Sequence, residues 1–206
     1  MNSVEIQFRH ETDLIMAPLS DCVVFERHRR MSVSEVQEQC IEAVQHLNVW
    51  RRRGERAPHK PLLVLFALSR AMRSSERLIP FKELSDPFKD LLLGFGIDRA
   101  SAHPEYPFWR LETNIWEVVP RSELRLRKSN SDPPHKELLR VNAQGGFLEP
   151  IWSELQADPK FACRIGCVVL HSYFPGVLHS NLCSAVGLDI PSGWTWPESM
   201  PCRATQ

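Results

Sequence analysis

Residues His103–Val118 read HPEYPFWRLETNIWEV, and the rest of the chain is organised around them. Three aromatic rings, two prolines and one arginine fall within the first eight of these residues. The polar triplet Glu112–Asn114 separates them from a second apolar run, Ile115–Val118. Each run is too short for a stable helix and is rich in aromatic or β-branched residues, which favours a β-hairpin with Asn114 in its turn. We expect a rigid two-stranded wing with His103 and Arg110 at its root.

Helical periodicity on both sides of the wing predicts a mainly helical scaffold. Ser34, with Gln37 three residues later, is typical of a capping box, and Asp158-Pro159 is typical of a helix start. The helix that opens at Lys60-Pro61 is apolar nearly all round, so we expect it to be the central core helix. The predicted helices cover residues 34–53, 60–72, 82–95, 135–143, 158–173 and 178–186, with a short extended piece at 78–81, a glycine stop at 145–146, an amphipathic segment at 147–156 and a proline break at 175.

This order of elements indicates an α+β, mainly helical fold. Two helices, a short strand, a third helix and a two-stranded wing are the loose pattern of a winged-helix-like bundle with a small antiparallel β-hairpin. Such folds commonly contact DNA, although a fold alone does not establish a function.

The chain of 206 residues is long enough for one domain of ordinary size. We expect residues 1–31 to be an N-terminal extension outside the folded domain, residues 32–190 to form that domain and residues 191–206 to be a loosely attached tail. Neither a transmembrane run nor a secretory signal is apparent. The six cysteines include no CxxC motif, which indicates a reduced, cytoplasmic protein. Cys163 and Cys167 fit a buried helix face better than a zinc pair.

The formal net charge is zero, with 25 basic against 25 acidic residues. This balance counts against a protein that coats nucleic acid without specificity, but it leaves room for local basic patches. Two basic runs stand out, and each is either a solvated helix end or a contact surface. The first run contains Arg51, Arg52, Arg53, Arg56 and Lys60, and the second contains Arg121, Arg125, Arg127 and Lys128.

The chain shows no recognisable catalytic motif. A GxSxG elbow, HExxH, P-loop and GxGxxG are all missing from the sequence. An HNH nuclease could use His171 and His179 near Asn181, but their spacing does not suit a compact metal finger. A thiol enzyme could use Cys183 near His179, but an apolar helix favours an inert thiol. We therefore expect a binding protein with no catalytic residues, no metal and no cofactor.

Three separate groups of cations and rings remain, at Arg56–Lys60, His103–Arg110 and Tyr173–His179. His59 and Lys60 stand at the N-terminal end of the predicted core helix, where free N–H groups and the helix dipole favour an anion such as a backbone phosphate. Each group also has a structural interpretation. His59 could simply cap the helix, the rings of the wing could be core, and Tyr173–Pro175 could be a plain corner.

Five spaced strings carry a resemblance to a known family: PHKPLLVLFAL, LIPFKEL, HPEYPFWRL followed by IWEV, GGF, and YFPGVLH followed by AVGL. From about Ser34 to Ile190 the chain resembles the sulfur-binding domain of phosphorothioate-dependent, McrA-like HNH restriction endonucleases. The resemblance implies recognition of double-stranded DNA in which sulfur replaces a backbone oxygen. In the family an HNH nuclease domain usually follows. Here only a short tail follows, so we expect a DNA-recognition domain without a fused nuclease domain. Any nuclease would then act in trans.

The resemblance also implies roles for individual residues. The sulfur pocket would be the helix break at Tyr173, Phe174 and Pro175, with Val177 and Leu178 as neighbours; which of the two rings forms its wall stays open. His103 and Arg110 would clamp the modified linkage or the adjacent base edges, since arginine is the usual guanine reader. Flanking phosphates would be held by Arg56, His59 and Lys60, and His179 would stand at the rim of the pocket.

Two alternatives remain. The chain could be a protein–protein adaptor of a restriction or defence system that uses the same aromatic ridge, or a divergent nuclease. An adaptor predicts no DNA binding, and a nuclease predicts cleavage of modified DNA with a divalent metal.

Overall fold

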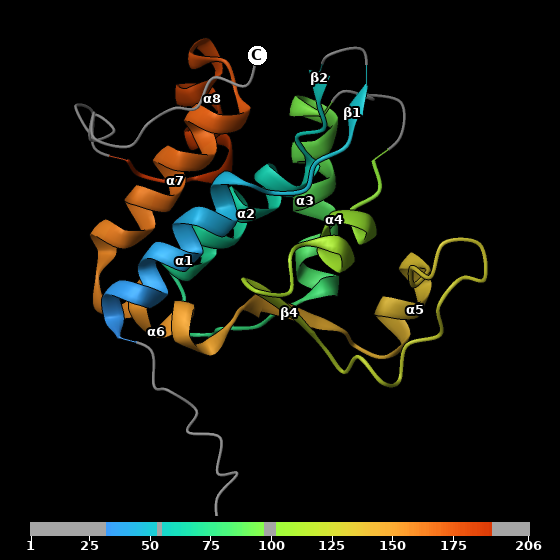
Figure 1. Cartoon of the computed structure of the whole chain (residues 1–206). Coiled ribbons are helices and arrows are strands. Elements are labelled where there is room, and N and C mark those ends of the chain that lie inside the picture. Colours follow the sequence, from blue (N-terminus) through green and yellow to red (C-terminus); the bar gives the residue numbers. More distant parts are fainter. Residues whose placement is uncertain (1–31, 53–54, 97–101, 191–206) are drawn as a thin grey trace, which may run out of the picture. The chain divides into compact units, whose positions relative to one another are not determined.

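The computed structural model describes residues 32–52, 55–96 and 102–190 (Figure 1), and for residues 51–56 it describes no side chains. The predictions for residues 1–31 and 191–206 lie outside the described residues. The helices are α1 (Val33–Gln45), α2 (His59–Ala71), α3 (Phe81–Phe95), α4 (Glu105–Arg110), α5 (His135–Arg140), α6 (Glu149–Ala157), α7 (Pro159–Tyr173), a 3-10 turn (Gly176–Leu178) and α8 (His179–Val186). The strands are β1 (Arg51–Arg52), β2 (Glu55–Arg56), β3 (Ile79–Pro80), β4 (Trp116–Val119) and β5 (Gln144–Phe147).

Helix α2 is the centre of the core, as the sequence predicts. Its residues from Pro61 to Leu65 are all buried, and it packs against α3, α4, α6, α7 and α8. Helix α1 packs against α6 and α7 on one side of this group. A helix buried over most of its circumference needs neighbours on several sides, and these five helices supply them.

The strands form two small antiparallel sheets. Strands β3, β5 and β4 lie in that order, with Ile79 opposite Gly145 and Trp116 opposite Phe147. Strands β1 and β2 pair with each other as a two-stranded ribbon. The prediction of an α+β, mainly helical fold with a small antiparallel β element is therefore confirmed.

The predicted wing at residues 103–118 is wrong in its first half. Glu105–Arg110 forms α4 instead of a strand, and β4 pairs with β5 rather than with it. Pro104 is the N-cap of α4 and Pro107 lies in its first turn, where a missing N–H costs little. Burial then favours the helix: Phe108 is fully buried, with its ring 4.8 Å from that of Phe81 and 6.0 Å from that of Trp116.

The predicted first helix is wrong at both ends. Its N-cap is Ser32 rather than Ser34, and the capping box is completed by Glu35 rather than Gln37. The helix ends at Gln45 rather than near Arg53, because the chain turns there and then enters the β1–β2 ribbon.

Gly145 and Gly146 lie in the central strand β5, where the sequence pattern predicts a stop. A Cβ atom at Gly145 would lie 2.8 Å from the rings of both Phe108 and Trp116. A Cβ atom at Gly146 would collide with the backbone carbonyl of Arg77. Close packing, rather than turn geometry, therefore requires these glycines.

The end of the chain follows its prediction closely. Helix α7 starts after Asp158, whose side chain accepts a hydrogen bond from the backbone N–H of Lys160 at 3.0 Å. It ends at Tyr173, before Pro175, and α8 ends at Gly187 in the left-handed conformation with φ 66°. Cys163 and Cys167 are buried in α7.

Candidate nucleic-acid interface

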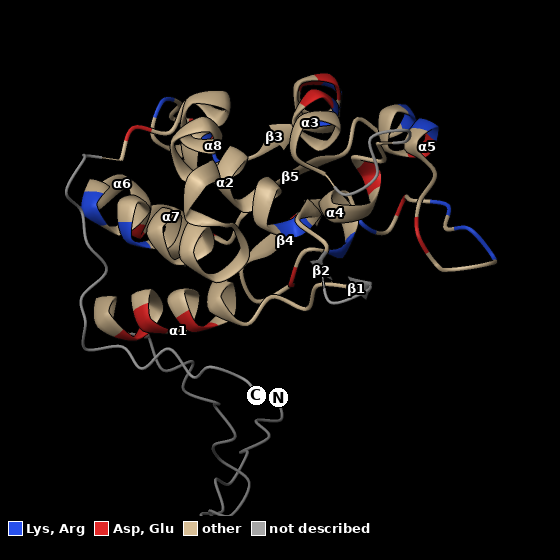
Figure 2. Ribbon diagram, turned by 90° about the horizontal axis from the view of Figure 1, so that it is seen from above, with Lys and Arg blue, Asp and Glu red and all other residues tan. Residues whose placement is uncertain are grey.

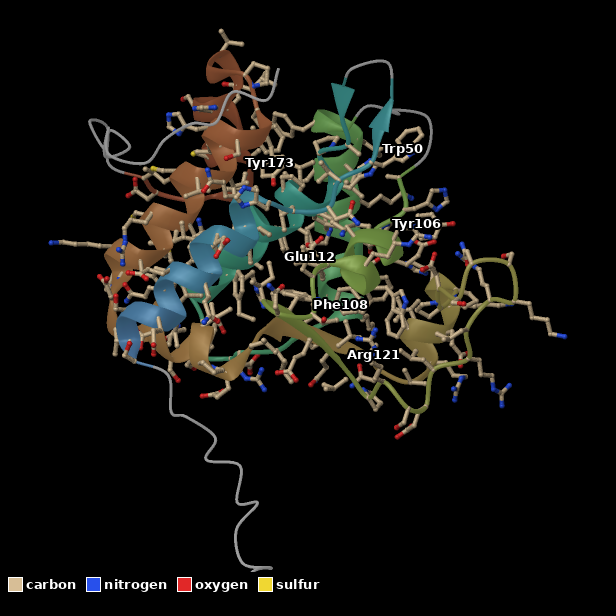
Figure 3. The ribbon with its side chains drawn as sticks, in the orientation of Figure 1. Trp50, Tyr106, Phe108, Glu112, Arg121 and Tyr173 are labelled. Carbon is tan, nitrogen blue, oxygen red and sulfur yellow. The ribbon has the colours of Figure 1, made fainter. Side chains whose placement is uncertain are left out.

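A cleft of about 760 Å³ opens between the segment that joins α1 to α2 and helix α4 with the turn after it. It brings together His59, Lys60 and Arg110, three of the residues that the sequence predicts for DNA contact. Figure 3 labels Trp50, Tyr106, Glu112 and Arg121, which also line it. Trp50 is 63% exposed, so a large ring stands at the edge of the cleft. A groove with cations and exposed rings suits a nucleic-acid strand.

Lys60 is paired inside this cleft. Its Nζ lies 2.6 Å from Oε1 of Glu112, and the same oxygen accepts a hydrogen bond from the backbone N–H of Asn48 at 3.0 Å. Both side chains are largely buried. Glu112 therefore ties α2, the segment after α1 and the turn after α4 to one another, and it compensates the charge of Lys60.

A cluster of cations surrounds the ring of Tyr106 on α4. The His103 ring centroid lies 5.2 Å from it, and the guanidinium carbons of Arg110 and Arg127 lie 5.2 and 5.4 Å from its centroid. Arg127 also donates a hydrogen bond to the Tyr106 hydroxyl at 3.1 Å. The structure thus brings His103 and Arg110 together, although His103 precedes α4 and Arg110 ends it, and no hairpin is formed there.

Two buried carboxylates hold this cluster in place. Glu105, 4% exposed, lies 3.3 Å from His103 Nδ1 and 3.6 Å from Arg127 Nη2. Asp132, 3% exposed, accepts hydrogen bonds from two nitrogens of the Arg110 guanidinium group. Arg110 Nε donates to Asp132 Oδ1 at 2.9 Å, and Arg110 Nη2 donates to Asp132 Oδ2. This hydrogen-bonded pair raises the pKa of Arg110, so the guanidinium stays charged and oriented.

Arg121 stacks on Trp109, with 4.3 Å between the guanidinium carbon and the ring centroid. Arg121 and Arg127 both come from the basic run at residues 121–128, which the sequence analysis noted without assigning it to the site. The basic run was the signal that could have placed them here. Burial of Glu105 and Asp132 has no sequence signal, because exposed and buried carboxylates look alike in the chain.

The helix break between α7 and α8 presents exposed apolar side chains. Pro175 is exposed and Val177 is 86% exposed, with Leu178 partly covered. Phe174 is buried, so its ring supports the turn from below. The Tyr173 hydroxyl accepts a hydrogen bond from the Leu47 N–H at 2.8 Å and lies 2.9 Å from the carbonyl oxygen of Gln45.

Tyr173 therefore ties the α7–α8 turn to the end of α1, directly before Asn48 in the wall of the cleft. His179 lies on the inner side of the turn, with Nε2 3.0 Å from the Phe174 carbonyl oxygen and its ring 5.0 Å from that of His171. The side chain of Arg56, on β2, lies outside the described part of the structure.

The four cysteine thiols in the described part of the chain do not suit catalysis. Burial raises the pKa of the Cys40 thiol to about 12 and that of Cys167 to about 11. Burial also raises the pKa of Cys183, the thiol nearest to His179 in the sequence. A thiol with a raised pKa forms little thiolate near neutral pH, which favours the inert interpretation. Among the described residues, no three His, Cys, Asp or Glu side chains are grouped so that they could hold a metal ion.

Comparison with known proteins gives a family. The family model described as ScoMcrA-like, DNA sulfur-binding domain matches residues 37–190. The chain therefore belongs to the family of ScoMcrA-like DNA sulfur-binding domains. No curated protein matches the chain.

Solved structures agree with this assignment. The sulfur-binding domain of ScoMcrA, complexed with phosphorothioated DNA, is 26% identical with a TM-score of 0.65, and the match covers 72% of this chain and 94% of that domain. The structure of the whole phosphorothioation-dependent restriction endonuclease ScoMcrA is also 26% identical with a TM-score of 0.63, and the match covers 72% of this chain but only 32% of the endonuclease.

The sulfur-binding domain of SprMcrA is 21% identical with a TM-score of 0.63, over 77% of this chain and 98% of that domain, and this likeness shows the fold alone. Among the described helices, none combines the length and apolar character that a bilayer crossing requires.

Proposed function

We propose that this chain binds double-stranded DNA that carries a phosphorothioate linkage, as the reader of a modification-dependent restriction system. The observation that carries the proposal is the match of residues 37–190 to the sulfur-binding domain family. The 26% identical ScoMcrA domain is described in complex with phosphorothioated DNA. The cleft, the cations around Tyr106 and the exposed apolar turn are compatible with this role.

The sulfur atom is assigned to the α7–α8 turn. Sulfur is larger, more polarisable and less strongly hydrated than the oxygen it replaces, so it leaves water at low cost. An ordinary phosphate oxygen placed there would lose its hydrogen bonds to water without replacement, which costs about 1–3 kcal/mol. That penalty gives about tenfold to hundredfold discrimination at one atom. Pro175 and Val177 are the exposed apolar side chains of the turn, with Leu178 beside them.

Tyr173 and Phe174 support the α7–α8 turn and do not themselves form most of its contact with sulfur. Tyr173 anchors the turn to α1, and the buried ring of Phe174 lies beneath it. His179 fixes the turn from inside by its contact with the Phe174 carbonyl oxygen. These three residues shape the apolar surface and leave most of the contact with sulfur to Pro175 and Val177.

The cations position the strand. Arg110, held by Asp132, and His103, held by Glu105, are oriented to meet the modified linkage or the neighbouring base edges. His59 and Lys60 in the cleft, with Arg56 nearby in the sequence, are assigned to flanking phosphates. Contacts of this kind give register and salt dependence without reading sequence.

A binding titration tests the proposal. The chain should bind a duplex with one phosphorothioate linkage and bind an unmodified duplex of the same sequence about tenfold to hundredfold more weakly. No binding to either duplex, with capture of a restriction protein instead, would favour the adaptor alternative. Equal binding to both would contradict the reader function.

We propose further that the chain binds phosphorothioated DNA in the cytoplasm and does not cleave it. Incubation of phosphorothioated plasmid with the chain and Mg²⁺ or Mn²⁺ should leave the plasmid intact. Linear or nicked product that depends on the chain would instead establish a nuclease.

A further inference from the structure

We propose that residues 121–140 form a second DNA-contact surface, the basic lobe, which binds unmodified phosphates beyond the cleft. This inference rests on the proposed function and extends it. The segment carries six Arg and Lys side chains against three Asp and Glu, in a chain whose formal net charge is zero. Its basic excess is therefore a local property and not a general one.

Two of the three acidic side chains of the lobe face inward, and the third, Glu123, is exposed. Asp132 is buried against Arg110 of α4, and Glu137 pairs with Arg140 at 2.7 Å. Glu137 also accepts a hydrogen bond from the backbone N–H of Arg125 at 3.0 Å. Two of the three acidic groups are thus spent on internal contacts, which hold the shape of the lobe and leave its outer face basic.

The outer face carries exposed cations. Arg121, Arg125, Lys128 and Lys136 are exposed, and none of them lies within ion-pair distance of an acidic side chain in the described ranges. Figure 2 shows Lys and Arg positions on α5 and on the loop that projects beyond it. Cations without an ion-pair partner can bind phosphate without first breaking an ion pair, unlike Lys60 in the cleft.

The projecting loop has a defined conformation. The Arg127 N–H donates to the Asp132 carbonyl oxygen at 2.8 Å, and the Ser131 N–H donates to the Arg127 carbonyl oxygen at 3.0 Å. Ser131 takes a positive φ of 57° to close this turn. Lys128 therefore stands at the tip of a hydrogen-bonded loop, so little conformational entropy is lost when it binds.

The basic lobe continues the cleft. Arg121 lines the cleft and stacks on Trp109, and Arg127 contacts Tyr106 in the cation cluster. A duplex carries one negative charge for about every 1.7 Å of its axis, so DNA that extends past the cleft presents further phosphates. Continuity with the cleft favours the same duplex as the occupant over an acidic protein. Arg121 and Arg127 belong to both sites and are left unchanged in the test.

The test compares two phosphorothioated duplexes, one that covers only the modified linkage and its neighbours and one that extends about one helical turn, roughly 10 base pairs, farther on each side. The wild-type chain should bind the longer duplex about tenfold more tightly. The slope of log affinity against log salt concentration should also be steeper, by an amount that corresponds to about two phosphate contacts. In the Lys128→Glu/Lys136→Glu variant this gain should disappear, while affinity for the short duplex stays near wild type.

The matched control is Arg73→Glu/Lys160→Glu, which makes the same change in net charge at exposed positions of other elements. It should keep most of the gain. If charge reversal lowers the thermal stability, Lys128→Gln/Lys136→Gln should still remove most of the length-dependent gain. Retention of the full gain in both lobe variants, or no gain in wild type, would overturn the basic lobe as a DNA contact.

The preference for modified over plain short duplex is a separate readout. Its loss in wild type would count against the proposed function. A preserved preference without a length-dependent gain would count against the basic lobe alone.

Discussion

Glu112 is the acidic residue whose position is least expected in a DNA-binding cleft. It neutralises Lys60 at 2.6 Å and fixes Asn48 through the backbone. A carboxylate beside the cleft repels ordinary phosphates, and it prevents Lys60 from binding them at full strength. Lys60 then contributes less to the binding of any duplex than an unpaired lysine would. This arrangement suits a reader that must ignore a large excess of unmodified DNA.

Removal of the Glu112 charge should therefore raise affinity for DNA in general. Glu112→Gln keeps an acceptor for the Asn48 N–H but releases Lys60, so affinity for unmodified duplex should rise severalfold and its salt dependence should steepen by about one contact. Affinity for modified duplex should rise by a similar factor, because Lys60 faces phosphates that both duplexes share and the sulfur contact is unchanged. Fluorescence anisotropy at several salt concentrations measures this, with Glu38→Gln on the outer face of α1 as a control. Unchanged binding of plain DNA in Glu112→Gln would contradict the role given to this residue.

At the scale of single residues, sequence reasoning found the cations better than the groups that hold them. His59, Lys60 and Arg110, which the sequence analysis placed in two separate groups, line one cleft. Glu105, Glu112 and Asp132 were not predicted, because their role depends on burial beside particular arginines, lysines and histidines that are distant in the chain. Of the proposed sulfur-pocket residues, Phe174 is buried and Val177 is widely exposed, a distinction that no sequence pattern carries.

At the scale of elements, local signals predicted α2 and α7 well. A proline near the start of each helix, with an aspartate cap for α7 and a proline break after it, is independent of tertiary context. Helix α4 was missed because its residues have strand propensity, and burial of Phe108 against Phe81 and Trp116 outweighs that propensity. Central strand β5 was missed because two glycines make a poor strand unless large rings pack over them.

The packing of those rings on β5 gives a stability prediction. Gly145→Ala places a methyl group 2.8 Å from the rings of Phe108 and Trp116, so the free energy of unfolding should fall by about 1–3 kcal/mol. Chemical denaturation measures this change. Gly94→Ala in α3 is the matched control, since nothing lies within 4 Å of the new methyl group, and it should stabilise by about 0.5–1 kcal/mol. Equal effects of the two substitutions would contradict the packing argument.

Helix α5 gives a prediction of pH dependence. The hydrogen bond from Arg140 lowers the pKa of Glu137 from 4.5 to about 2. A carboxyl group with a lowered pKa stabilises the folded state above its ordinary pKa, and this stabilisation is lost as pH falls from 4.5 toward 2. Glu137→Gln should therefore be less stable than wild type near neutral pH, and the difference should shrink across that acidic range. A difference that is the same at both ends of the range would show that Glu137 acts only through its shape.

At the scale of the whole molecule, the neutral net charge limits binding to DNA in general, and the basic local surfaces hold a strand that is already bound. Carboxylates restrain the cations of the cleft and of the Tyr106 cluster, while the α7–α8 turn offers an uncharged surface. We therefore expect low affinity for DNA in general, so that a single sulfur atom can decide whether the complex forms. Balanced composition counts against a non-specific DNA coat, but only the folded chain shows which of the described cations are in ion pairs.

The most direct test of this division is the ratio of dissociation constants for plain and phosphorothioated duplex, measured near physiological salt, about 0.15 M. We expect a wild-type ratio of about ten to a hundred. Pro175→Ala should lower the ratio, whereas Lys60→Ala should weaken binding to both duplexes and leave the ratio nearly unchanged. Equal affinity of the wild-type chain for the two duplexes would contradict the proposed recognition of the phosphorothioate sulfur.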